Sequence, residues 1–263
     1  MSTALRREGN TLRTRLTEPQ WAGVCAGFGE PGVGPGGTDH PLGPLTAATG
    51  EPADPDVLDA ARLALGATAV IVDVTTAEGD RGVVSRLGSD LTAAAAVTRV
   101  LGPPPDGDSQ AALVPGVEVC LTRAENLTAE ITRLVPPDRR TVEPPRPARW
   151  KLPHEFALVW SRAVRDGDDA LVAEIAATCG WDEPPPELVA AAEHLEASVA
   201  VAVRVAGSDK TVLLRWVRTE RGWLRLIPTR DSIVHEPCTR AGIVDTLVDT
   251  LAGAFGAEAV AGR

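Results

Sequence analysis

The sequence predicts an α+β protein in which two repeated halves of mainly antiparallel sheet are flanked by helices, with a helical segment between them. Two observations carry this prediction. Alternating valines predict a strand at residues 70–74 (VIVDV) and, 131 residues later, at 201–205 (VAVRV). A shift of 117 residues aligns TRA at 122–124 with TRA at 239–241, at the start of the last helix of each half. Such internal similarity indicates one structural unit that occurs twice.

The first half begins with a helix over residues 54–65. Its apolar residues have helical spacing, Asp54 can cap it, and Pro55 suits the first helical position. The alternating strand over 67–74 and the turn TTAEGDR (75–81) follow. The elements expected to complete this half are strands over 82–87, 91–100 and 117–121 and a helix over 123–135.

The second half has the same order. We expect a helix over 185–195, a strand over 198–206, the turn AGSDKT (206–211), strands over 211–217, 223–228 and 232–237, and a helix over 239–255. In the middle hairpin, pairing of Val217 with Gly222 is expected to place Trp216 opposite Trp223.

These elements divide the chain into five parts. We expect a flexible Gly/Pro-rich N-terminal segment (1–53), the first half (54–135), a basic Pro-rich linker (136–151), a helical segment (152–184) and the second half (185–257). The helical segment reads as two short helices over 152–165 and 168–180, of which the second stops at Gly180.

Composition and charge limit the partners. The net charge of −10 argues against nucleic acid, because a nucleic-acid partner requires clustered Lys and Arg. The chain has no run of eighteen uncharged apolar residues, and its start lacks the apolar core of a signal peptide. We therefore expect a cytoplasmic protein with no membrane partner.

No cofactor, metal or catalytic residue is expected. The four cysteines and four histidines are too scattered for a zinc or redox motif. The glycines of GFGEPGVGPGG (27–37) fit a dinucleotide-binding turn, but no apolar strand precedes them and prolines interrupt the required helix, so we interpret the stretch as a surface loop. Asp108 and Ser109 lie in a proline-rich loop without the strand and glycine elbow of a hydrolase nucleophile.

Four stretches of the chain match the pattern of a known family. They are residues 54–74 (first helix and strand), 125–137 (a helix ending in a Leu-x-x-Leu-Pro-like block), 152–195 (central helices) and 220–255 (a Gly-Trp strand, a further strand and the closing helix). Together they resemble the EspG family, the cytosolic substrate chaperones of actinobacterial type VII (ESX) secretion. The resemblance covers residues 54–255, and the N-terminal segment departs from it.

The resemblance implies a protein that binds and does not catalyse. Its expected function is to hold a secreted helical substrate, PE/PPE-like or WXG100-related, soluble in the cytoplasm for export. Family members bind the helical tip of PE/PPE heterodimers through the sheet and C-terminal helical parts. The residues themselves leave an alternative open, a small-ligand-binding domain or enzyme with a site between the two halves. A homodimer also remains open.

We expect the partner to contact the exposed sheet and its turns, where a rigid scaffold presents polar loops. Arginines on the sheet can donate paired hydrogen bonds to carboxylates of a partner. Reversing Arg204 and Arg215 to Glu is expected to weaken capture of the partner and to leave the melting temperature nearly unchanged. The predicted partner-binding residues are Glu78, Asp80, Arg81, Arg86, Arg204, Asp209, Lys210, Arg215 and Arg225.

Overall fold

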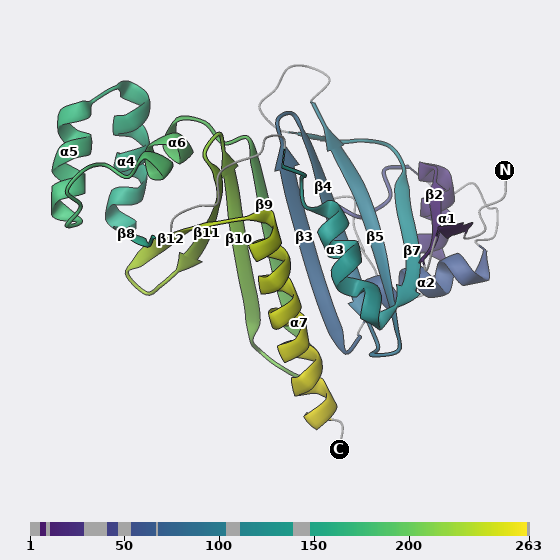
Figure 1. Cartoon of the computed structure of the whole chain (residues 1–263). Helices are drawn as coiled ribbons and strands as arrows, with labels where there is room; N and C mark the ends of the chain where they lie inside the picture. Colours follow the sequence, from purple (N-terminus) through teal and green to yellow (C-terminus); the bar gives the residue numbers. More distant parts are fainter. Residues whose placement is uncertain are drawn as a thin grey trace. The chain divides into compact units, whose positions relative to one another are not determined.

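A computed structural model describes residues 6–8, 11–28, 41–46, 54–66, 68–103, 111–138 and 148–261 (Figure 1). The chain divides into two compact units: unit 1 comprises Met1–Val135, Val201–Leu213 and Leu247–Arg263, and unit 2 comprises Pro136–Ala200 and Leu214–Thr246. Three elements have residues in both units, namely β9 (Ala197–Val205), β10 (Thr211–Thr219) and α7 (Arg240–Ala261).

Unit 1 is built on a sheet with the strand order β1-β2-β7-β5-β4-β3-β9 (Figure 1). The pairings from β1 to β3 are antiparallel, and the short β6 pairs with β5. The strands are β1 (Arg6–Glu8), β2 (Thr11–Leu16), β3 (Val70–Glu78), β4 (Arg81–Ser89), β5 (Ala93–Gly102), β6 (Ala112–Leu113) and β7 (Val117–Arg123). The helices are α1 (Glu18–Ala26), α2 (Pro55–Leu65), the 3₁₀ turn η1 (Ala124–Asn126) and α3 (Leu127–Leu134).

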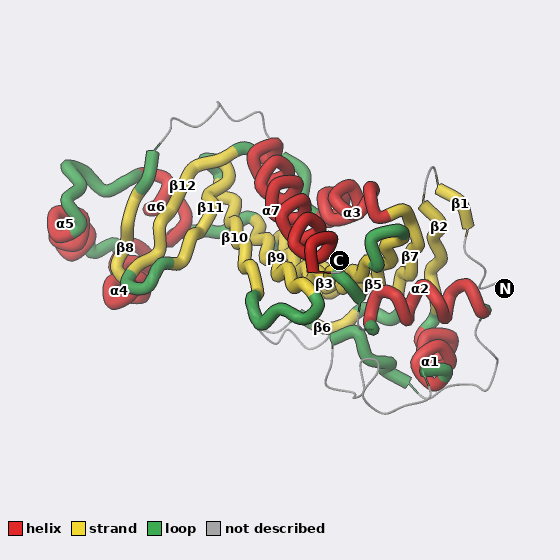
Figure 2. The backbone as a smooth tube through the Cα atoms, turned by 90° about the horizontal axis from the view of Figure 1, so that it is seen from below, coloured by secondary structure: helices red, strands yellow, loops and turns green. Residues whose placement is uncertain are grey.

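Helices cover both faces of this sheet. In Figure 2, α1 and α2 lie on one face, and α3 and the C-terminal turns of α7 lie on the other. The apolar face of α2 packs with Ala95, Val97 and Val119 in one core. The approach is close: a Cβ added at Gly88 would lie 2.0 Å from the carbonyl oxygen of Leu63. Gly88 is therefore the residue that lets α2 rest directly on β4.

A buried ion pair fixes the N-terminal elements to the sheet. Arg99 of β5 is 0% exposed and Glu18 of α1 is 6% exposed. Arg99 donates to Glu18 Oε1 at 2.8 Å, and Glu18 also accepts the backbone N–H groups of Gly116 at 2.7 Å and Leu45 at 3.0 Å. Burial alone would raise the pKa of Glu18, but these donors hold it below its usual value.

Three elements precede residue 54 that the sequence analysis did not identify: β1, β2 and α1. The strand β2 has no simple apolar alternation, because Arg13 is held inside by Glu118 at 2.6 Å and Glu130 at 2.9 Å. The helix α1 has a visible start signal, since Thr17 and Gln20 have capping-box spacing and Gln20 accepts the N–H of Thr17 at 2.9 Å. That signal was sufficient to predict α1.

Unit 2 combines the strands β10, β11, β12 and β8, in that order, with three helices. Its elements are β8 (Trp150–Pro153), α4 (His154–Asp166), α5 (Asp169–Thr178), α6 (Pro186–Glu193), β11 (Gly222–Pro228) and β12 (Ser232–Cys238). The helices share a core around Trp160, whose ring lies 5.6 Å from that of Trp181 at an interplanar angle of 87°. The strand β8 was not expected; it occupies the end of the predicted linker, of which residues 139–147 lie outside the described residues.

The predicted opposition of Trp216 and Trp223 is wrong. Thr219 pairs with Gly222, so Trp216 faces Arg225 and Trp223 faces Arg218. The turn is shorter than expected because Thr219 Oγ1 accepts the N–H of Arg221 and Gly222 adopts a φ of 114°. Both tryptophans are buried, and the guanidinium of Arg218 lies 5.5 Å from the ring centre of Trp223.

The α+β class, with antiparallel sheet flanked by helices, is confirmed. Along the chain, a helix, four main strands and a helix occur twice, as α2 to α3 and as α6 to α7. Superposition of the two halves, and with it the five-part division, stays a prediction. Among the described residues, no helix has the length and apolar character needed to span a membrane.

We predict that Glu18→Gln lowers the free energy of unfolding by about 3 to 5 kcal/mol, because Arg99 is left buried without a countercharge. Denaturant titration measures this loss. Asp59→Asn is the control: it breaks an ion pair with Arg62 in which both side chains are exposed, and it should change stability by less than about 1 kcal/mol. Equal losses in the two variants would contradict the structural role of the buried pair.

Candidate partner-binding surfaces and an apolar pocket

The β3–β4 hairpin presents three of the predicted partner-binding residues. Glu78 pairs with Arg81, so the turn consists only of Gly79, at a φ of 58°, and Asp80. Asp80 and Arg81 are exposed, and Glu78 is half-buried. The turn is shorter than the predicted 75–81 because a Gly-Asp pair suffices for a two-residue hairpin turn.

The β9–β10 hairpin presents two more, Asp209 and Lys210, both exposed at its tip. Gly207 has a φ of 70°, and Ser208 Oγ accepts the backbone N–H of Lys210 at 3.2 Å, which orders the turn. The first residues of β10 add exposed apolar side chains beside this tip, one on each face of the strand, since Val212 is 46% and Leu213 is 52% exposed. Charged and apolar groups therefore adjoin in one short segment.

Arg86 and Arg204 bind the same carboxylate. Asp73 of β3 lies between them: Arg86 of β4 donates Nε–H to Asp73 Oδ1 at 2.6 Å, and Arg204 of β9 donates to Asp73 Oδ2. Two guanidinium groups and one carboxylate leave one positive charge on this row, and all three side chains are partly exposed. The buried Nε of Arg204 has no hydrogen-bond partner among the described residues.

Arg215 and Arg225 point to opposite faces of the sheet in unit 2. Arg215 pairs with Leu226, and Arg225 pairs with Trp216, so successive positions along the strands separate the two arginines. Arg215 is exposed, whereas Arg225 is half-buried. The structure therefore places the predicted residues in several local groups and does not bring Arg215 and Arg225 onto one surface.

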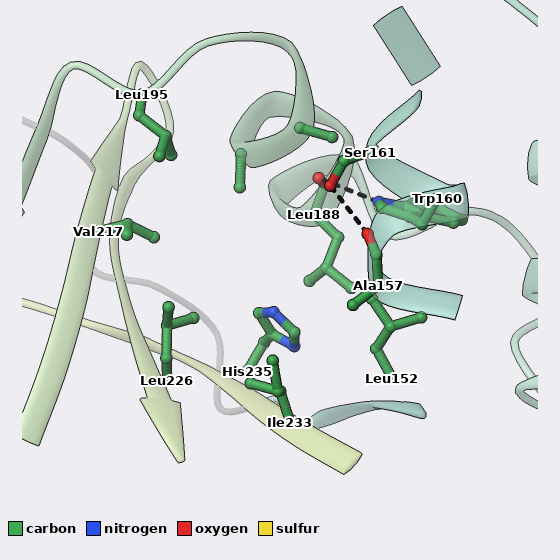
Figure 3. Close-up of a pocket in the computed structure, with 12 residues that line it drawn as sticks. Leu152, Ala157, Trp160, Ser161, Leu188, Leu195, Val217, Leu226, Ile233 and His235 are labelled. Atoms are coloured by element: carbon green, nitrogen blue, oxygen red, sulfur yellow. Dashed lines mark hydrogen bonds between the residues drawn. The ribbon is translucent and has the colours of Figure 1, made fainter. Parts of the chain in front are cut away.

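Unit 2 contains a pocket of about 180 Å³ that the sequence analysis missed (Figure 3). Strands β8, β10, β11 and β12 form one side, and helices α4 and α6 form the other. Its lining is Leu152, Ala157, Trp160, Ser161, Leu188, Ala191, Ala192, Leu195, Val217, Leu226, Ile233 and His235. The sequence signal for it was a histidine, His235, directly after the apolar residues Ile233 and Val234 of a strand.

Few polar atoms face this pocket. The indole N–H of Trp160 donates to the carbonyl of Leu188 at 3.4 Å, and the hydroxyl of Ser161 donates to the carbonyl of Ala157 at 3.0 Å (Figure 3). The imidazole of His235 is the third polar group of the lining, and its Nδ1 is buried. Burial lowers the pKa of His235, and backbone groups of Trp150 and Ile233 oppose part of that shift. The imidazole is therefore neutral near pH 7.

The other sequence motifs add no described site. Within the described ranges, no three His, Cys, Asp or Glu side chains are grouped to hold a metal ion. Residues 29–37 of the glycine-rich stretch, and Asp108 and Ser109, lie outside the described residues. Burial raises the pKa of Cys25 and Cys120 to about 12, so these thiols are poor nucleophiles.

Comparison with known proteins finds a similar fold but no similar sequence. No protein-family model and no curated protein matches the chain. Among solved structures, it is similar to the type VII secretion system chaperone EspG5 of Mycobacterium tuberculosis, determined in complex with the PE25–PPE41 dimer. The two are 13% identical, with a TM-score of 0.56 over 90% of this chain and 96% of that chain. This similarity shows a shared fold.

A second solved structure also aligns with the chain. It is the full-length peroxisomal multifunctional enzyme type 2 of Drosophila melanogaster, with 8% identity and a TM-score of 0.18 over 88% of this chain and 49% of that chain. A TM-score this low carries no argument about fold or function.

The row at Asp73 changes the expectation for the two arginine reversals. We predict that Arg204→Glu lowers the melting temperature by about 2 to 4 °C, because it places a second carboxylate beside Asp73 at a cost of about 1 kcal/mol. Arg215→Glu, at an exposed position, should shift it by less than about 1 °C. Thermal unfolding followed by circular dichroism measures both. Indistinguishable melting temperatures would argue against the shared carboxylate.

We predict that His235→Phe flattens the dependence of stability on pH. Because the folded pKa of His235 lies below 6.5, the unfolded chain takes up its proton first, and stability is lost as the pH falls below that value. Between about pH 7.5 and pH 5, wild-type protein should lose more stability than the variant. Parallel urea titrations across this range measure the difference, and equal losses would contradict a buried neutral histidine.

Proposed function

We propose that this chain is a chaperone of the EspG type. It binds a helical substrate of a type VII secretion system, PE/PPE-like or WXG100-related, holds it soluble in the cytoplasm for export, and catalyses no reaction. The observation that carries the proposal is the fold shared with EspG5 over 90% of the chain, since EspG5 is a secretion chaperone determined with a bound PE25–PPE41 dimer.

The β9–β10 hairpin supplies a contact surface of suitable chemistry. A protein interface needs apolar area that loses water on binding and a polar rim that fixes orientation. Leu213 offers apolar area on one face of β10 and Val212 on the other, and Asp209 and Lys210 offer the rim. The strand residues of this hairpin are held in the sheet, so little conformational entropy is lost when a partner docks against them.

The charged groups of β3 and β4 add direction to this binding. The row of Arg86, Asp73 and Arg204 retains one positive charge on a protein of net charge −10, and Asp80 and Arg81 form a mixed pair at the hairpin tip. Exposed charges of this kind contribute little affinity singly, but they favour one orientation of an acidic partner and raise its association rate.

The pocket in unit 2 favours a second candidate function, the binding of a small molecule. This site differs from the one considered from the sequence, because it lies within unit 2. Its lining is apolar apart from Ser161 and His235, and such a lining is typical of sites that bind a small, mainly apolar molecule.

The chaperone proposal is tested by purifying the tagged chain from its native host and identifying co-purified proteins by mass spectrometry. We predict capture of a pair of helical PE/PPE-like or WXG100-related proteins. The double variant Lys210→Glu, Leu213→Ser should retain about one tenth of this capture, which corresponds to a loss of about 1.4 kcal/mol.

Leu158→Ser is the matched control, because Leu158 is a leucine 83% exposed on α4, outside the hairpin. Its capture should equal that of the wild type. Purification of the wild-type chain without any such partner would overturn the proposed function. Equal capture by the double variant would instead remove only the β9–β10 hairpin from the contact surface.

A further inference from the structure

The pocket of unit 2 has the size of a small organic molecule. The pocket opens to solvent, and its volume of about 180 Å³ is similar to the roughly 150 Å³ of an engineered apolar cavity that takes up benzene. Leucine, valine, alanine and tryptophan side chains form most of its wall. Such a space is filled more favourably by an apolar ring than by water, because water finds few hydrogen-bond partners there.

The wall is held in place by contacts that do not involve a ligand. Trp160 is fixed by its hydrogen bond to the carbonyl of Leu188 and by edge-to-face packing on Trp181. Leu152, Leu188 and Ala192 belong to the buried core that α4, α5 and α6 share. A ligand therefore enters a largely preformed site and does not have to order it.

One residue of the lining carries a polar ring. The ring of His235 stands between Leu226 and Leu152 in the middle of the lining residues (Figure 3). A neutral imidazole has one nitrogen that can accept a hydrogen bond. A ligand with a hydroxyl or N–H group therefore finds a hydrogen-bond partner in an otherwise largely apolar wall.

We infer that this pocket binds a small aromatic molecule that carries one hydroxyl or N–H group, with the ring against Trp160 and the leucines and the polar group hydrogen-bonded to His235. Phenols and indoles have this chemistry. The inference rests on the second candidate function and names its ligand class. It is independent of the proposed chaperone function, because all its residues lie in unit 2 and none belongs to the β9–β10 tip or the row at Asp73.

Fluorine NMR of the full-length protein tests the inference with two probes of nearly equal shape, 4-fluorophenol and fluorobenzene. We predict saturable binding of both, with 4-fluorophenol about fivefold tighter, as one net hydrogen bond provides. In His235→Phe, which keeps a ring of similar size, the preference for 4-fluorophenol should disappear and fluorobenzene should still bind.

Two further variants show where the probes bind. Ala191→Leu extends a lining side chain into the space and should weaken both probes at least about tenfold. Leu158→Ala, outside the lining, should leave both affinities unchanged and shows that α4 tolerates substitution. Absence of saturable binding to the wild type, unchanged binding in a folded Ala191→Leu, or a preference that persists in His235→Phe would each overturn the inference.

Discussion

The ion pair between Glu18 and Arg99 is the interaction on which unit 1 depends. Its hydrogen bonds join α1, residues 43 and 45 of the following segment, β5 and the turn before β7 at one buried point. Two charges removed from water cost several kcal/mol each, and this cost is offset only because Glu18 accepts hydrogen bonds from three donors. The pair therefore fixes where α1 covers the sheet.

Because α1 and α2 cover only part of this sheet face, the rest of the face remains partly exposed. In register, Arg99 lies opposite Val84, and Arg86 lies opposite Asp73, so these side chains share one face of the sheet. At β5 the face is buried beneath α1 and α2, whereas at β3 and β9 the row of Arg86, Asp73 and Arg204 is partly exposed. One face thus provides both core and charged surface, and the β9–β10 hairpin adds exposed apolar side chains beside its charged tip in the same unit.

Local patterns were sufficient to predict most of the fold. Alternating valines gave β3 and β9, and helical spacing with Asp54 and Pro55 gave α2. The strand β2 was not predicted, because its inward residue, Arg13, is charged and is buried only through ion pairs with Glu118 and Glu130 of distant elements. A packing relation between distant segments cannot be read from local periodicity.

The candidate surfaces likewise include residues that local sequence predicts and residues that it does not. The hairpin tips at Asp80 and at Lys210 were predictable, because turn residues between strands are exposed. The pairing of Arg86 with Asp73 could also have been predicted, since a two-residue turn at Gly79-Asp80 fixes that register. The third member of the row, Arg204, and the pocket around His235 could not be predicted from the sequence, because both depend on tertiary packing.

Hydrogen–deuterium exchange of the chain with and without its co-purified partner tests whether the chain is a binding protein whose contact surface includes the β9–β10 hairpin. Binding should slow exchange at residues 206–213 and at the tip at 79–81, and should leave α5 unchanged. Protection confined to α4 and α5, or no protection at either hairpin, would contradict it.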